Sequence, residues 1–170
     1  MMYDIYLSMG CRELPVLEDL VTQIPMLADP ALQQKILTGS PHHPGFLGLD
    51  LPEELAQALF RRLKSKRAAG LWLLSAYRLP RVSKEQAAML AEPAIAELKR
   101  KHFERYPDDT LSAVYFVGER PEVWVFGYTS EQLVAKNIIP GGPRVGVDKV
   151  DGHIWTREDF GRREQRLEGK

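Results

Sequence analysis

The spacing of apolar residues changes near Thr110, and this change constrains the fold more than any other feature of the sequence. Over residues 87–103 apolar side chains recur every three or four positions, which is typical of one face of a helix. Over residues 111–117 and 122–128 they recur every second position, which is typical of strands. A helix followed by neighbouring strands predicts an α+β protein with an antiparallel sheet in its second half.

The first part of the chain is predicted to contain two strands and three helices. Residues 3–8 and 71–77 read as strands, and the second of these is mostly apolar, as in a buried strand. Between them, the apolar spacing predicts helices over residues 14–24, 30–38 and 51–69.

Two local signals set the start of the third of these helices. Asp50 and Glu53 have the spacing of a capping box, in which each side chain binds a backbone amide of the first helical turn. Residues 40–49, which precede it, contain several prolines and glycines, so we expect a loop there.

The second part is predicted to begin with a long helix. Ser83 and Gln86 form a second capping box at its start. Pro93 lies inside the helical pattern, and an interior proline removes a backbone hydrogen bond, so we expect a kink or a break beside it. A short helix with a cap at Thr129 is expected further on.

Two hairpins are expected to complete the sheet. A loop at residues 118–121 joins the first two strands, and residues 145–150 and 153–156 form the second hairpin. The Asp151-Gly152 dipeptide between them favours a type I′ turn, with a positive φ at both residues. The predicted sheet therefore has about four strands.

We place a domain boundary at Pro80 to Ser83. Residues 1–80 are predicted to form an N-terminal β-α-α-α-β subdomain. Residues 81–170 are predicted to form a helix packed on a curved antiparallel sheet, followed by a charged tail from Arg157 that reads as a frayed helix.

Charge and cysteine content narrow the classes of partner. The 23 basic and 23 acidic residues give a formal net charge of zero, whereas nucleic-acid binders usually carry a basic excess. From its first residues we expect no secretory signal, and since no stretch approaches the roughly 18 consecutive apolar residues of a membrane span, we expect none. Cys11 is the only cysteine, which fits a reducing compartment. We therefore expect a cytoplasmic protein that binds neither nucleic acid nor membrane.

Two groups of residues have side chains suited to metal binding or acid–base chemistry. His42 and His43 supply two ligands from one loop, whereas catalytic zinc takes three protein ligands. Asp148, Asp151 and His153 cluster at the last hairpin and could bind a cation or transfer protons. Both groups also read as ordinary loop or turn residues, so we expect no metal, no cofactor and no catalytic site. A small hydrolase or metal-dependent enzyme that uses them is kept as an alternative.

The strand over residues 122–128 is apolar on both faces. Trp124, Phe126 and Tyr128 share one face, while Val123 and Val125 share the other. A sheet that packs on a helix needs only one apolar face. We therefore expect that both faces are covered or that one of them is a binding surface.

Residues 124–128 (WVFGY) and 147–152 (VDKVDG) resemble segments of the cystatin/NTF2-like bacterial immunity-type domains, including YrhB-like ones. In those domains a W-x-F-x-Y strand precedes a V-D-K-x-x-G hairpin, although a threonine or similar residue is common where this chain has Asp151. The resemblance implies a helix on a curved antiparallel sheet, and a protein that binds and blocks a bacterial toxin or effector.

Residues 1–80 are similar in element order to the C-terminal domain of ribosomal protein L7/L12 and to the ClpS adaptor fold. This second resemblance implies a ribosome or protease adaptor, which is the other alternative function.

The expectation is therefore a protein-binding module of the immunity type, without enzymatic activity. Interface aromatics usually dominate binding, and charges around them orient the partner. The residues expected to bind the partner protein are Glu119, Trp124, Asp148, Asp151, His153 and Trp155. The sequence leaves the oligomeric state open.

Overall fold

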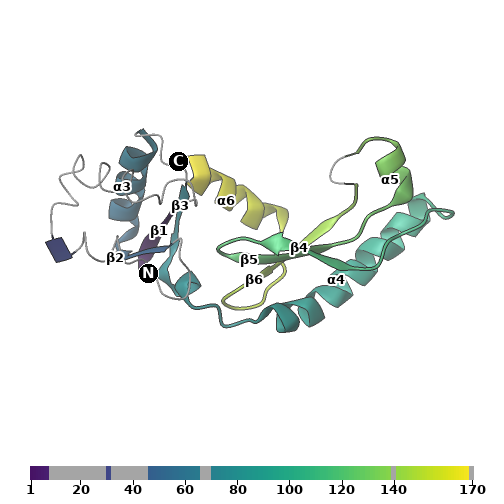
Figure 1. Cartoon of the computed structure of the whole chain (residues 1–170), viewed down its shortest axis with the longest axis horizontal. Helices are drawn as coiled ribbons and strands as arrows, with labels where there is room; N and C mark the ends of the chain where they lie inside the picture. The colour runs from purple at the N-terminus through teal and green to yellow at the C-terminus, as the bar shows by residue number, and fades with distance from the viewer. Residues whose placement is uncertain (8–29, 32–45, 66–69, 139–140, 169–170) are drawn as a thin grey trace. The chain divides into compact units, whose positions relative to one another are not determined.

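The computed structural model describes residues 1–7, 30–31, 46–65, 70–138 and 141–168, and Figure 1 shows its elements. The chain divides into two compact units. The first comprises Met1–Leu79 and Glu158–Lys170, and the second comprises Pro80–Arg157. Helices and antiparallel sheets occur in the chain together, so the α+β class is confirmed.

The first unit contains a three-stranded antiparallel sheet in the order β2-β1-β3. Its strands are β1 (Tyr3–Leu7), β2 (Phe46–Leu51) and β3 (Gly70–Leu74). Helix α3 (Glu53–Ser65) packs on β1 and β3. Its buried residues recur every three or four positions, so they form one stripe facing the sheet. The core comprises Ala56, Leu59, Phe60 and Leu63 of α3 together with Tyr3, Ile5, Leu7, Leu49 and Trp72.

Strand β2 is the main correction to the sequence-based prediction of this unit. The predicted loop over residues 40–49 is wrong from Phe46 onward, and Asp50 is not a helix cap. Asp50 instead lies within β2 with a φ of 50°, and α3 begins at Glu53. The strand forms because it pairs with β1 and because the buried Asp4 carboxylate accepts a hydrogen bond from the Leu49 amide at 3.0 Å.

Asp4 also holds the segment that follows β3. The strand predicted over residues 71–77 ends at Leu74 and continues as the 3-10 turn η3 (Ser75–Arg78). From this turn, Ser75 Oγ donates to Asp4 at 3.1 Å and the Arg78 guanidinium forms an ion pair with it. A buried carboxylate needs such partners, because a buried charge without them is strongly disfavoured.

Some expected features lie outside the described residues. These are the helix predicted over residues 14–24, most of the helix over residues 30–38, the loop with His42 and His43, and Cys11. Of the second helix, Pro30 and Ala31 are described, and both are helical.

The second unit contains the antiparallel sheet β4-β5-β6 and the long helix α4 (Lys84–Arg105), which packs on β5 and β6. The strands are β4 (Tyr115–Glu119), β5 (Val123–Gly127) and β6 (Arg144–Asp148). The predicted capping box of Ser83 and Gln86 is confirmed, and α4 continues through Pro93 without a break. The core comprises Ala87, Ala91 and Ile95 of α4 against Phe126, Tyr128, Val145 and Val147.

The sheet of the second unit has three strands rather than about four. Residues 153–156 contribute an isolated bridge, between Ile154 and Val147. The predicted type I′ turn is also wrong, since φ is positive at Gly152 (78°) but not at Asp151. The loop instead covers residues 149–152, and the Asp148 amide closes it by donating to the His153 carbonyl at 2.9 Å.

Two further helices complete the described structure. The short α5 (Glu131–Ala135) is capped by Ser130, one residue later than predicted. The charged tail forms α6 (Arg157–Glu168). Every helix among the described residues is too short or too polar to cross a bilayer.

Candidate functional site

Two of the six residues expected to bind a partner are buried and bonded to each other. Trp155 is 7% exposed and Asp148 is 1% exposed. The Trp155 Nε1 donates to Asp148 Oδ2 at 3.0 Å, and the Val150 amide donates to Asp148 Oδ1 at 2.8 Å. These side chains hold together the loop that follows β6, so they present little surface to a partner.

Glu119 and Trp124 surround a buried lysine. The Lys149 side chain is inaccessible to solvent, and its Nζ lies 2.5 Å from Glu119 Oε1 and 4.3 Å from the centre of the Trp124 ring. Burial lowers the pKa of Lys149, while the hydrogen bond to Glu119 favours the charged form and acts in the opposite direction. Trp124 is further fixed by Nε1, which donates to the Val82 carbonyl at 2.9 Å. Of the two, the Glu119 side chain is the more accessible, at 44% exposed.

Asp151 and His153 are exposed and contact each other. His153 Nδ1 lies 2.7 Å from Asp151 Oδ1, and the His153 amide holds the pKa of Asp151 below its ordinary value. Together with Asp148, they place one ligand atom each within 4.8 Å of one another. However, both oxygens of Asp148 already accept hydrogen bonds from Val150 and Trp155. A cation would have to displace these bonds to recruit Asp148.

A buried histidine, aspartate and serine meet between α4 and α5. His102 Nε2 lies 2.6 Å from Asp109 Oδ2, and Ser130 Oγ donates to the same oxygen. Burial alone would raise the pKa of Asp109, but hydrogen bonds from Ser130, His102 and the Gln132 amide outweigh it and lower the pKa to about 2. In a catalytic triad the histidine bonds the serine, whereas here both bond the aspartate. The cluster therefore anchors the start of α5 to the end of α4.

The outer strand of the second sheet exposes a run of apolar residues. Val114 is 45% exposed, Tyr115 is 39% exposed, and Phe116 and Val117 are each 40% exposed. Charges and prolines are two of the devices that protect an edge strand from pairing, and residues 113–117 contain neither. The register against β5 shifts between Phe116 and Gly118, which makes Val117 the extra residue of a β-bulge. We call Val114–Val117 together with β4 the β4 edge.

Cations lie beside the β4 edge on both faces of the sheet. On the face toward α4, Phe116 packs against Phe126 with ring centres 5.7 Å apart, and Lys84 Nζ lies 5.2 Å from the Phe116 ring. On the other face, Arg144 Cζ lies 5.6 Å from the Tyr115 ring. Arg144 reaches Tyr115 across Gly127, where a Cβ would lie only 2.8 Å from Arg144 Nη1. The edge is thus apolar in the middle and flanked by positive charge.

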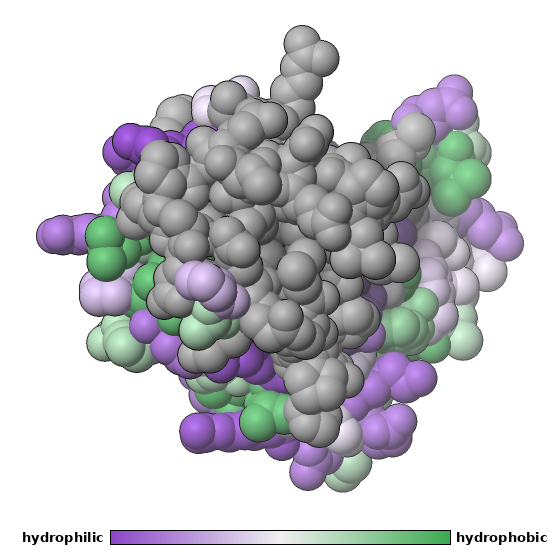
Figure 2. Space-filling model, turned by 60° about the vertical axis from the view of Figure 1, so that its left-hand side comes forward, coloured by the Kyte–Doolittle hydropathy of each residue, from purple (hydrophilic) through white to green (hydrophobic). Residues whose placement is uncertain are grey.

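The apolar pattern over residues 111–117 predicted a strand close to β4, but it did not predict a binding site along Val114–Val117. The available signal was an uninterrupted apolar run without a charged residue. On the face shown in Figure 2, by contrast, hydrophobic residues are interspersed with hydrophilic ones among the coloured residues, as on an ordinary protein surface.

No family model, curated protein or solved structure matches this chain.

Proposed function

We propose that this chain is a protein-binding module that captures an extended segment of a partner protein along the β4 edge. The observation that carries the proposal is the exposure of four consecutive apolar residues, Val114–Val117, at the outer strand of a sheet. An edge strand presents backbone donors and acceptors that an added strand can pair with. Side chains of the added strand then supply the specificity.

The flanking charges favour a partner segment with an apolar centre and acidic residues around it. Lys84 lies on one face of the β4 edge and Arg144 on the other. Side chains of an added strand alternate between these faces, so acidic residues on either face meet a cation. Complementary charge of this kind speeds and orients docking.

The resemblance of residues 124–128 and 147–152 to immunity-type domains supports a bacterial toxin or effector as the partner, bound in the cytoplasm. In this proposal Asp148 and Trp155 maintain the fold, because both are buried. The accessible residues Glu119, Asp151 and His153 remain candidates for contacts at the rim.

The proposal is tested by site-specific photo-crosslinking in the native host. A photoreactive residue at Val117 is compared with one at Met89, an exposed apolar residue of α4. A protein enriched only at position 117 is then purified, and its affinity is measured for wild type, Val117→Lys and Met89→Lys. We expect Val117→Lys to weaken binding at least about tenfold, the loss typical of an interface hot spot. Met89→Lys should bind like wild type.

Hydrogen exchange and ultracentrifugation distinguish the other outcomes. Strand addition should slow amide exchange at residues 114–118 in the complex. Unchanged exchange there, or an equal loss of affinity in Met89→Lys, would contradict the proposal. A dimer of the isolated chain that Val117→Lys converts to a monomer would also contradict it, because the β4 edge would then pair with a second copy.

A further inference from the structure

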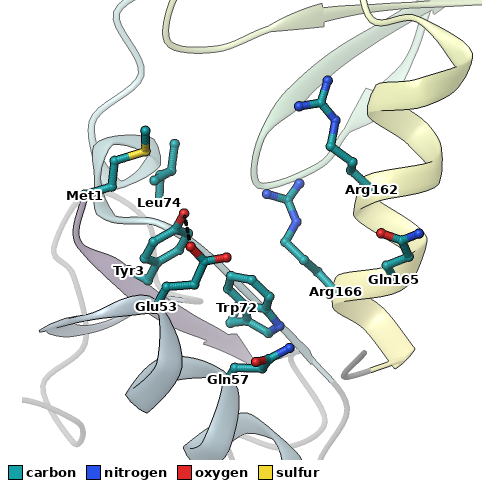
Figure 3. Close-up of a pocket in the computed structure, with 9 residues that line it drawn as sticks. All are labelled: Met1, Tyr3, Glu53, Gln57, Trp72, Leu74, Arg162, Gln165 and Arg166. Carbon is teal, nitrogen blue, oxygen red and sulfur yellow. Dashed lines mark hydrogen bonds between the residues drawn. The ribbon is translucent and has the colours of Figure 1, made fainter.

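The first unit contains a cavity of ≈ 480 Å³ that is separate from the β4 edge. It lies between the sheet of that unit and α6, as the close-up in Figure 3 shows. Small-molecule sites typically have volumes of about 300–1,000 Å³ and combine an apolar lining with a few polar groups. The size of this cavity therefore suits a small ligand.

Two aromatic rings form one side of the cavity. The ring centres of Tyr3 and Trp72 are 5.2 Å apart with an interplanar angle of 60°. Both residues are buried members of the core, so neighbouring side chains fix their rings in place. Tyr3 also donates through its hydroxyl to Glu53 Oε2 at 3.2 Å. A flat apolar ring can pack against this pair at the tilted geometries that aromatic groups prefer.

The opposite side of the cavity is cationic. Arg162, Gln165 and Arg166 line it from α6, at positions three and four apart along the helix. Figure 3 shows both guanidinium groups extending from α6 on the side that faces the sheet. Arg162 also pairs with Asp159 at 3.1 Å and with Glu158 at 3.6 Å, but a guanidinium has five N–H donors and can bind a further carboxylate.

Trp72 supplies a second, independent observation. Its Nε1 is buried and has no hydrogen-bond acceptor among the described residues. Buried donors without acceptors are rare in folded proteins, so each one marks a place where an acceptor is expected. This donor belongs to a residue that lines the cavity.

We propose that this cavity binds a small aromatic carboxylic acid. The ring of the ligand packs against Tyr3 and Trp72, and its carboxylate binds the guanidinium groups of Arg162 and Arg166. Guanidinium and carboxylate match in shape and charge, and this match selects an acid over an amide of the same size. The site is independent of the proposed partner binding, because it uses no residue of the second unit.

The experiment follows the indole N–H signals of the full chain by NMR while 2-naphthoate is added. The chain has three tryptophans, and Trp72→Phe identifies the signal of Trp72. The neutral 2-naphthamide serves as the matched ligand control. The variants are Arg162→Gln and Arg166→Gln, with Arg157→Gln as a control on the same helix that does not line the cavity.

We expect 2-naphthoate to shift the Trp72 signal saturably while the signals of Trp124 and Trp155 stay in place. The amide should bind at least tenfold more weakly, and each of the two lining variants should weaken naphthoate binding at least tenfold. Unchanged Trp124 and Trp155 signals show that a variant is folded. A Trp72 signal that stays fixed at millimolar naphthoate would overturn the proposal. So would equal binding of acid and amide, or an equal loss of binding in Arg157→Gln.

Discussion

The indole Nε1 of Trp155 donates a hydrogen bond to the carboxylate of Asp148 at 3.0 Å, and both side chains are buried. This bond joins the end of β6 to the segment that returns beside it through the Val147–Ile154 bridge. Both residues were predicted from the sequence to contact a partner protein, but they lie inside the fold. We therefore expect substitution of either residue to change the stability of the fold.

We predict that Asp148→Ala lowers the free energy of unfolding by about 1–3 kcal/mol, the cost of leaving buried donors without an acceptor. The donors affected are Trp155 Nε1 and the Val150 amide. Asp151→Ala is the matched control, because that side chain is 65% exposed and should change stability by less than about 0.5 kcal/mol. Urea denaturation measures both variants, and equal effects would contradict the structural role of Asp148.

Gly142 should not tolerate a side chain. A Cβ at this residue would lie 2.0 Å from the Tyr128 carbonyl oxygen, which is backbone and can move only with the strand region around it. We expect Gly142→Ala to destabilise the protein by about 1–3 kcal/mol, as overpacking does. Gly118→Ala is the control, since a Cβ there meets no described atom within 4 Å. The melting temperatures of the two variants test this prediction. If Gly142→Ala melts at the same temperature as Gly118→Ala, the loop at Gly142 can move to accommodate a Cβ, and the prediction is wrong.

Asp109 should make stability depend on pH in the acid range. Its pKa is about 2 in the folded chain, below its ordinary value of 3.8. A lowered carboxylate pKa stabilises the folded state above the unfolded pKa, and this contribution disappears as the pH falls toward the folded value. The difference in stability between wild type and Asp109→Asn should therefore narrow as the pH is lowered from about 5 to about 2.

Denaturant titrations at several pH values measure this difference. Asp108→Asn removes an exposed neighbouring carboxylate and serves as the control. If the difference in unfolding free energy between wild type and Asp109→Asn stays constant across this pH range, His102 and Ser130 do not favour the ionised form of the Asp109 carboxylate.

The buried Lys149 should make Glu119 important for stability. Glu119→Gln leaves the buried ammonium without the carboxylate to which it hydrogen-bonds, and we expect the free energy of unfolding to fall by about 1–3 kcal/mol. Lys149→Met removes the buried cation itself and leaves Glu119, whose side chain is 44% exposed and can be hydrated, so this variant should cost less. The double variant, Glu119→Gln with Lys149→Met, should then have about the stability of Lys149→Met alone. Urea denaturation of wild type, both single variants and the double variant tests this. If the two single losses of stability simply add in the double variant, the two residues are not coupled.

Local signals in the sequence predicted several elements well. The capping box of Ser83 and Gln86 needs contacts only within one helical turn, so its pattern is complete in the sequence. Strand β1 was likewise expected from its own residues. Strand β2 was missed because its stability comes from β1 and Asp4, which lie 40 or more positions away along the chain.

The candidate site was predicted less well than the fold. An apolar or acidic residue in a strand can face the core, a partner protein or solvent. The alternation of apolar and polar residues along the strand does not show which of the three it faces. Trp155 was expected to contact a partner, yet the chain folds it back against Asp148. Tyr115 and Phe116 belonged to a recognised strand, but their exposure depends on which strands become neighbours.

The sequence by itself determined the α+β class, the start of α4 and the period of the strands, because these depend on propensity and on contacts a few residues apart. The tertiary structure alone decided that β4 is an edge, that Lys149 is buried beside Trp124, and that Trp72 faces the arginines of α6 across a cavity. Each of these results joins residues that are distant in the chain. Their positions follow from sheet order and packing, which no local pattern encodes.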